Sequence, residues 1–106
     1  SKDEPKLRVR AGHELGKCFV IEGWFSEAIG EFKESIKAIA GSDNNSELAI
    51  RYDLMQALAK KAQADKNVDL AREAMDICSR IARKDISYRD IRDCRRNLDI
   101  LVKELD

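Results

Sequence analysis

The side chains of this 106-residue chain that could do chemistry are few and lie far apart in the sequence. Its single histidine, His13, cannot supply the paired acid–base groups or the ligand cluster that most catalysis and metal binding require. The cysteines Cys18, Cys78 and Cys94 are odd in number and have no C-x-x-C spacing, which argues against a zinc site and a disulfide framework. Glycine-rich phosphate loops and H-E-x-x-H motifs are absent. We therefore expect no enzyme, no metal and no cofactor.

Three arginines near the C-terminus, Arg92, Arg95 and Arg96, raise the question of nucleic-acid binding. Asp90 and Asp93 interleave with them, and the whole chain has 20 basic and 20 acidic residues, so its net charge is zero. Phosphate-driven binding needs a positive field that such a balance does not provide. We expect no nucleic-acid partner and interpret this segment as a charged helix that covers one end of the fold.

The composition also indicates in which cellular compartment the protein is expected. No run of 18 apolar residues is present, so no membrane-spanning segment is expected. The chain has no signal peptide, and its isolated cysteines are interpreted as small buried hydrophobic residues of a reducing compartment. These features predict a cytoplasmic protein. Because the chain begins with Ser1, we also expect it to be a segment of a longer protein.

Hydrophobic periodicity predicts an all-α fold. Apolar residues recur at i, i+3, i+4 and i+7, glycine and proline are sparse, and β-branched residues do not alternate with polar ones. Gly41 is expected to end the second helix, and Ser87 with Asp90 resembles a capping box that opens the fifth. The five predicted helices cover about residues 5–22, 25–40, 46–64, 67–83 and 87–105. On the first helix, the residues placed on related apolar faces are Leu7, Ala11, Leu15, Phe19 and Val20.

An internal repeat decides how these helices are expected to be arranged. Residues 12–40 overlay on residues 55–83, a shift of 43 positions, and one register serves both helices of each pair. Small residues fall on small ones, as required where two helices of a hairpin approach closely. The pairs of similar size are Leu15/Leu58, Gly16/Ala59, Ala28/Ala71 and Phe32/Met75.

The first unit resembles the tetratricopeptide repeat. That family places Leu-Gly-x-x-Tyr on its first helix and Ala-x-x-x-Phe on its second, and this chain has Leu15-Gly16-Lys17-Cys18-Phe19 and Ala28-Ile29-Gly30-Glu31-Phe32. Gly12 stands where the pattern has Trp, and Ala40 where it has Pro. The second unit is degenerate, and its spacing exceeds the family's repeat of about 34 residues. Residues 85–92 look like the segment that closes arrays of this family in bacterial proteins.

The resemblance implies a single domain over residues 1–106, in which antiparallel helix hairpins stack as a right-handed α-solenoid. Repeat 1 would cover about residues 5–40, the loop 41–46, repeat 2 about 46–83, and a capping helix about 87–105. The chain would then be the C-terminal repeat segment of a larger bacterial protein.

The resemblance also implies a function, protein–protein interaction through the concave face formed by the first and third helices. Carried over by position, the groove residues are Arg10, His13, Lys17, Val20, Asp53, Gln56, Lys60 and Gln63. Arg10, His13 and Lys17 share one face on helical geometry alone, and with Lys60 they would form a basic strip able to hold a carboxylate of a peptide or partner subunit. Two alternatives stay open: an ordinary solvated face, and a segment that binds nothing and is structural or dimerising. We expect a monomer or weak homodimer.

Trp24 and Phe25 are adjacent aromatic residues with different repeat partners. Phe25 falls on apolar Val68 and is assigned to the core, whereas Trp24 falls on Asn67. Trp24 is therefore either packed under a neighbouring element or an exposed contact for a partner.

Overall fold

The computed structural model of the chain describes residues 3–106, and the first two residues of the predicted domain lie outside this range. The described residues form helices and turns without a β-strand, which confirms the all-α prediction and the number of helices. The helices are α1 (Glu4–Glu22), α2 (Phe25–Ile39), α3 (Asn44–Asp65), α4 (Val68–Lys84) and α5 (Ile91–Leu105).

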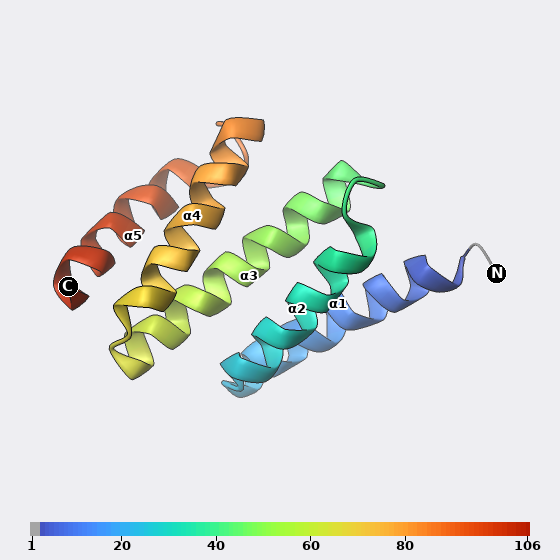
Figure 1. Cartoon of the computed structure of the whole chain (residues 1–106), viewed down its shortest axis with the longest axis horizontal. Helices are drawn as coiled ribbons and strands as arrows, with labels where there is room; N and C mark the ends of the chain where they lie inside the picture. Colours follow the sequence, from blue (N-terminus) through green and yellow to red (C-terminus); the bar gives the residue numbers. More distant parts are fainter. Residues whose placement is uncertain (1–2) are drawn as a thin grey trace.

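Each helix packs against the next one along the chain, and α1 additionally contacts α3. Figure 1 shows α3 in the middle of the molecule, with α1 and α2 on one side and α4 and α5 on the other. The two ends of the chain lie at opposite ends of this row, and the molecule measures 48 × 29 × 18 Å. Because α3 is covered from both sides, eight of its residues are buried, the largest such number in any of the helices.

The α1–α2 hairpin is closed by an approach that only small residues permit. Gly16 lies directly against the ring of Phe32, so a Cβ atom added at Gly16 would stand 2.3 Å from a ring carbon. One turn earlier, a Cβ added at Gly12 would stand 2.5 Å from the hydroxyl of Ser35, which donates a hydrogen bond to the carbonyl of Val9. These contacts explain why glycine stands at both positions, and they confirm the close helix approach expected at Gly16.

The face of α1 that is buried differs from the one expected. Val9 and Gly16 are buried, whereas Leu7, Ala11 and Leu15 are exposed. The cause is the close approach of α2, because the glycine face allows the two backbones to come together and the larger side chains are then turned outward. The prediction that Leu7, Ala11 and Leu15 lie on faces related to those of Phe19 and Val20 was therefore wrong, because only Phe19 and Val20 among these five pack against the core.

Two further core assignments need correction. Phe25 is only partly buried and stands outside the main core cluster. Cys18, expected to be a buried hydrophobic residue, is exposed, whereas Cys78 and Cys94 are buried. Phe25 is the first residue of α2, and Cys18 lies on the outward face of α1, so neighbouring helices cover neither position fully.

The capping box predicted at Ser87 does not form. The N-cap of α5 is Asp90, and the helix begins at Ile91 rather than near residue 87. The preceding residues fold as turns, in which the amide of Ser87 donates to the Asp85 carboxylate at 3.0 Å. Arg89 adopts a left-handed conformation with φ +42°, which is incompatible with helix at that residue.

Glu47 holds the loop between α2 and α3. Its carboxylate is buried, accepts a hydrogen bond from the amide of Gly41 at 3.2 Å, and pairs with Arg51 at 3.3 Å and Lys84 at 3.6 Å. Burial by itself would raise the pKa of Glu47, but the Gly41 amide and the two cations outweigh it and lower the pKa below its usual value. One side chain thus connects the loop, α3 and α4.

A comparison of Gly16→Ala with Gly30→Ala tests the close approach of α1 and α2 at Gly16. Gly16→Ala is expected to lower the free energy of unfolding by about 1–3 kcal/mol, because the added methyl group must displace a buried aromatic ring. Gly30→Ala, at a helical position with no atom within 4 Å of the added carbon, is expected to raise it by about 0.5–1 kcal/mol through helix propensity. Urea unfolding followed by circular dichroism measures both. Equal effects of the two substitutions would contradict the close approach.

Glu47→Gln is expected to lower the free energy of unfolding by about 1–3 kcal/mol at pH 7, since a charged acceptor with three donors is lost. The folded-state pKa of Glu47 lies below its unfolded value of about 4.3. Its stabilisation is therefore complete above that unfolded value and disappears as the pH falls through the folded pKa. The difference from wild type should shrink in urea titrations at pH 3. Glu34→Gln, which alters an exposed pair with Lys37, is the control and should cost under about 0.5 kcal/mol.

Candidate interaction site

His13 connects α1 to α3 rather than facing solvent. Its Nε2 atom lies 2.6 Å from the Asp53 carboxylate, and both side chains are about three-quarters buried or more (18% and 25% exposed). The imidazole also packs edge-on against Phe32, with ring centroids 5.8 Å apart. Two of the predicted groove residues, His13 and Asp53, are therefore brought together, but they are bonded to each other and link α1 to α3.

The predicted basic strip is interrupted by carboxylates. Lys17 pairs with Glu14 at 2.8 Å, and this hydrogen bond is the main cause of a raised pKa of Lys17. Arg10 is exposed and lies, with His13, beside a hollow between α1 and the start of α3. Val20 packs against the core instead of projecting from it. In the α1 half of the predicted groove, Lys17 is thus paired with Glu14, His13 is bonded to α3, and Val20 packs inward.

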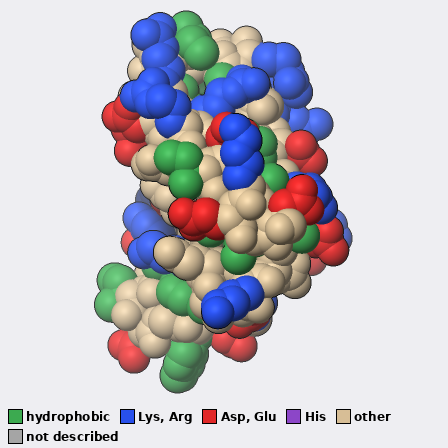
Figure 2. All heavy atoms as spheres, turned by 90° about the vertical axis from the view of Figure 1, so that its left-hand side faces the viewer, with side chains coloured by type: hydrophobic (Ala, Val, Ile, Leu, Met, Phe, Trp, Pro, Cys, Tyr) green, Lys and Arg blue, Asp and Glu red, His purple; other side chains and the backbone are tan. Residues whose placement is uncertain are grey.

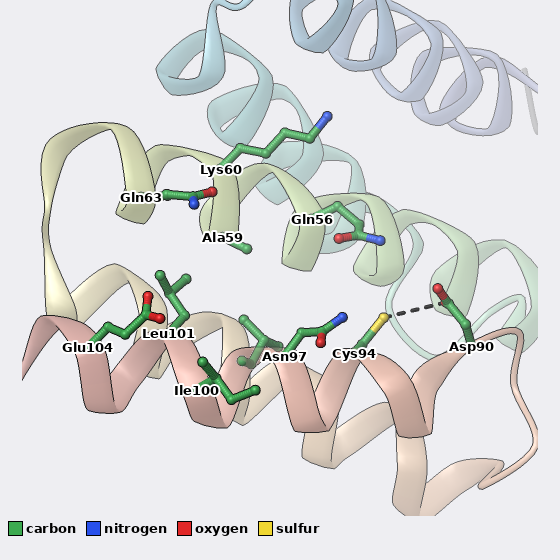
Figure 3. A pocket seen from close by; sticks show the side chains of 11 residues that line it. Gln56, Ala59, Lys60, Gln63, Asp90, Cys94, Asn97, Ile100, Leu101 and Glu104 are labelled. Atoms are coloured by element: carbon green, nitrogen blue, oxygen red, sulfur yellow. Dashed lines mark hydrogen bonds between the residues drawn. The ribbon is translucent and has the colours of Figure 1, made fainter.

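The other three predicted groove residues line a cavity, and its second wall is α5 rather than α1. Gln56, Lys60 and Gln63 project from α3 on one side of this cavity of about 390 Å³. Figure 3 shows Asn97, Leu101 and Glu104 rising from α5 toward α3. The complete lining consists of Gln56, Ala59, Lys60, Gln63, Asp90, Cys94, Asn97, Leu98, Ile100, Leu101 and Glu104.

The cavity has an apolar floor with polar groups around it. Leu98 is buried, Ala59 and Leu101 are partly buried, and all three pack in the core cluster. Amide side chains surround this floor together with three charged groups, Lys60, Asp90 and Glu104, so the lining has one more negative group than positive. Such a surface suits a ligand that offers both hydrogen-bond donors and acceptors.

A hydrogen-bond network closes one end of the cavity. The Tyr52 hydroxyl donates to the Asp90 carboxylate at 2.5 Å and accepts from the Gln56 amide at 3.0 Å. Burial and the bond to Asp90 raise the pKa of Tyr52, and the same bond lowers the pKa of Asp90. The Cys94 thiol lies 3.4 Å from Asp90, and the Arg89 guanidinium lies 4.8 Å from the centre of the Tyr52 ring. The network fixes the start of α5 against α3.

Sequence reasoning missed Tyr52, Asn97 and Glu104 as neighbours of the groove. Tyr52 stands four residues before Gln56 and so shares its helix face, which was an available signal. Asn97 and Glu104 lie on α5, which was interpreted only as a cap, and nothing in the sequence places that helix opposite α3.

Trp24 is half-exposed at the α1–α2 turn. It is 55% accessible, and its ring lies 5.9 Å from that of Phe19, centroid to centroid. Trp24 is therefore not packed under a neighbouring element, since only one side of the indole rests on the protein.

The surface of α5 that faces away from the cavity carries both signs of charge. Figure 2 shows Lys and Arg interspersed with Asp and Glu on this side of the molecule, with more basic side chains toward its upper end. Arg96 pairs with Asp93 on this helix, and Lys103 pairs with Asp99 at 3.0 Å.

Within residues 3–106, no cluster of three or more His, Cys, Asp or Glu side chains has a metal-binding arrangement. No helix in this range has the length and hydropathy needed to cross a membrane.

Comparison with protein-family models, curated proteins and solved structures finds no match to this chain. The resemblance to the tetratricopeptide repeat therefore rests on the sequence pattern of residues 15–19 and 28–32.

The three thiols are expected to differ sharply in reactivity. Cys18 is exposed, while burial raises the pKa of Cys78 and, together with the neighbouring Asp90, raises that of Cys94 to about 11. At pH 7 and low micromolar protein, DTNB should react quickly with one thiol, and Cys18→Ser should abolish that phase. All three should react in 8 M urea. A second fast thiol in the folded protein would contradict the buried environment of Cys94.

Proposed function

We propose that this chain is a protein–protein interaction module, an α-solenoid segment that binds an extended peptide of a partner protein. The peptide would lie in the groove between α3 and α5. The observation that carries the proposal is the cavity of about 390 Å³ there, lined by the groove residues Gln56, Lys60 and Gln63. Its volume lies in the lower part of the range of ligand pockets, about 300–1,000 Å³.

The contacts between alternate helices support a solenoid arrangement. His13 and Asp53 join α1 to α3, and Lys33 and Glu73, 2.9 Å apart, join α2 to α4. The α3–α5 cavity continues the first of these rows. A protein built in this way presents one row of helices on each side, and an elongated surface along a row suits an extended ligand.

The chemistry of the cavity favours a peptide backbone as the ligand. Gln63 and Asn97 each carry a carbonyl acceptor and an amide donor, the same pair of groups that an extended peptide offers at every residue. The apolar floor at Ala59 and Leu101 would receive a hydrophobic side chain of the peptide. Lys60 on one wall and Glu104 on the other would favour a peptide with one acidic and one basic residue.

This proposal moves the ligand from the α1–α3 face to the α3–α5 face. A carboxylate clamp built on His13 and Lys17 is not its basis, because both side chains already have acidic partners, Asp53 and Glu14 respectively. The end of the groove held by Tyr52 and Asp90 would stay rigid on binding, which reduces the entropy lost when the peptide binds.

A peptide selection tests the proposal. A phage-displayed library of random 12-residue peptides, selected on the wild-type protein, should yield binders that Ala59→Arg weakens at least about tenfold, since the long side chain fills the floor. Asn97→Ala should weaken them several-fold by removing one hydrogen-bonding partner. Isothermal titration calorimetry measures the affinities.

Ala38→Arg is the matched control, because it introduces the same side chain at an exposed position of α2. It should leave peptide affinity unchanged, and circular dichroism should show native helix content in each variant. Selections that yield no binder, or binders that Ala59→Arg and Ala38→Arg affect equally, would refute the groove.

A further inference from the structure

The outer face of α1 is an apolar stripe with no covering element within residues 3–106. Leu7, Ala11, Leu15 and Cys18 follow one another at intervals of four, four and three residues, so they share one side of the helix. All four are exposed. Ile21, which is 82% accessible, extends the stripe along one of its edges. The stripe lies opposite the glycine face that packs on α2. The core of this domain therefore does not use these side chains.

Exposed large hydrophobic residues concentrate at this end of the molecule. Six such residues occur in the described part of the chain, and Leu7, Leu15, Ile21 and Trp24 are four of them. Trp24 directly follows the C-cap of α1 and rests on Phe19, so its open side extends the apolar surface beyond the helix end. Glu14, seven residues from both Leu7 and Ile21, shares this side of the helix and pairs with Lys17 at 2.8 Å. Apolar residues gathered in this way mark an interaction site more often than scattered single residues do.

The charges beside the stripe have opposite signs at its two ends. The first half of α1 carries three basic residues, Lys6, Arg8 and Arg10, and one acidic residue, Glu4, whereas the second half carries Glu14 and Glu22 with one basic residue, Lys17. The last turn has no basic residue and ends at Glu22, for which the described chain provides no ion-pair partner. Arg8 has only a solvent-exposed contact with Glu4 at 3.5 Å, a pair that is easily exchanged.

We propose that α1 is a homodimer interface, in which the stripes of two copies pack antiparallel across a two-fold axis that passes near Leu15. In this register position n of one copy faces position 30 − n of its partner. Leu7 then lies between Ile21 and Trp24 of the second copy, and Ala11 lies beside its Cys18. Arg8 faces Glu22 of the second copy, and the same pair recurs on the other side of the axis.

A second copy fits this surface because the charge pattern of α1 is self-complementary. Antiparallel packing brings the basic first half of one helix to the acidic end of the other, and Arg8 supplies the positive charge that the last turn of α1 lacks. The two helix dipoles oppose each other, and the zero net charge of the chain adds no overall repulsion. An isologous contact of this type closes after two copies.

The contact is small, so the dimer should be weak. One helix of 19 residues and the adjoining turn form it, which places it below the interface area of about 1,200–2,000 Å² that stable complexes bury. The groove between α3 and α5 takes no part in it, and dimerisation is therefore independent of the proposed peptide binding.

Sedimentation velocity from 10 µM to 1 mM protein tests the proposal. Wild type should shift from monomer to dimer across this range. Leu15→Glu should raise the dimer dissociation constant at least about tenfold, because it places two like charges at the axis. Ile86→Glu introduces the same charge at an exposed apolar position in the turn before α5 and should leave the dissociation constant unchanged. A wild-type monomer at 1 mM, or equal effects of the two substitutions, would overturn the proposal.

Charge reversal tests the antiparallel register. Arg8→Glu alone and Glu22→Arg alone should each weaken the dimer several-fold, because each places like charges opposite one another. The double variant Arg8→Glu/Glu22→Arg should regain the wild-type dissociation constant. A double variant as weak as the single ones would exclude this register.

Cysteine cross-linking gives an independent readout. Wild type should form little disulfide-linked dimer under mild oxidation, because the two Cys18 residues would be separated by six positions, about 9 Å along the helix, beyond disulfide reach. Ala11→Cys should cross-link efficiently, since the introduced thiol lies beside Cys18 of the second copy. Ala11→Cys/Cys18→Ser should not. Efficient linkage of wild type would indicate a parallel pairing and overturn the model.

Discussion

The contact between Gly16 and Phe32 is the constraint from which most of this structure follows. It lets α1 and α2 approach more closely than any side chain at position 16 would allow. The same ring supports the His13 imidazole edge-on, and that imidazole bonds to Asp53 on α3. One glycine therefore sets the hairpin, and through Phe32 and His13 it sets how the hairpin meets the third helix.

Polar ties, rather than additional apolar surface, fix the remaining junctions. Glu47 joins the loop at Gly41 to α3 and α4. Tyr52 and Asp90 hold the beginning of α5 at α3. Each tie satisfies a buried or partly buried polar group, and no side-chain nitrogen or oxygen among the buried described residues lacks a partner. Because hydrogen bonds depend on direction, these ties specify one arrangement of helices that the apolar faces alone would leave less defined.

The two proposed interaction surfaces differ in chemistry as a result. The α3–α5 groove combines amides with a small apolar floor and suits a peptide backbone. The outer face of α1 is an apolar stripe with Glu14 within it and further charges at its ends, and it suits another helix of the same pattern. They lie at different ends of the row of helices, so a dimer through α1 would leave both grooves open and would present two copies of the peptide site.

The sequence by itself determined the elements of this protein. Apolar periodicity placed all five helices, and the ends of α2 and α4 fall within one residue of their predicted positions, because local side-chain spacing and capping act within a few residues. The repeat also indicated that small residues such as Gly16 and Ala28 lie at a close helix contact, where both are buried.

Only the tertiary structure decided which of two plausible faces α1 buries. Leu7 and Leu15 form a good apolar face by spacing, yet the face of Val9 and Gly16 is covered, because backbone approach at a glycine outweighs the size of the side chains. In the same way, the partner of Gln56 and Lys60 proved to be α5, and Asp90 proved to be the acceptor for Tyr52. Such pairings join residues about 40 positions apart, and local sequence carries no signal for them.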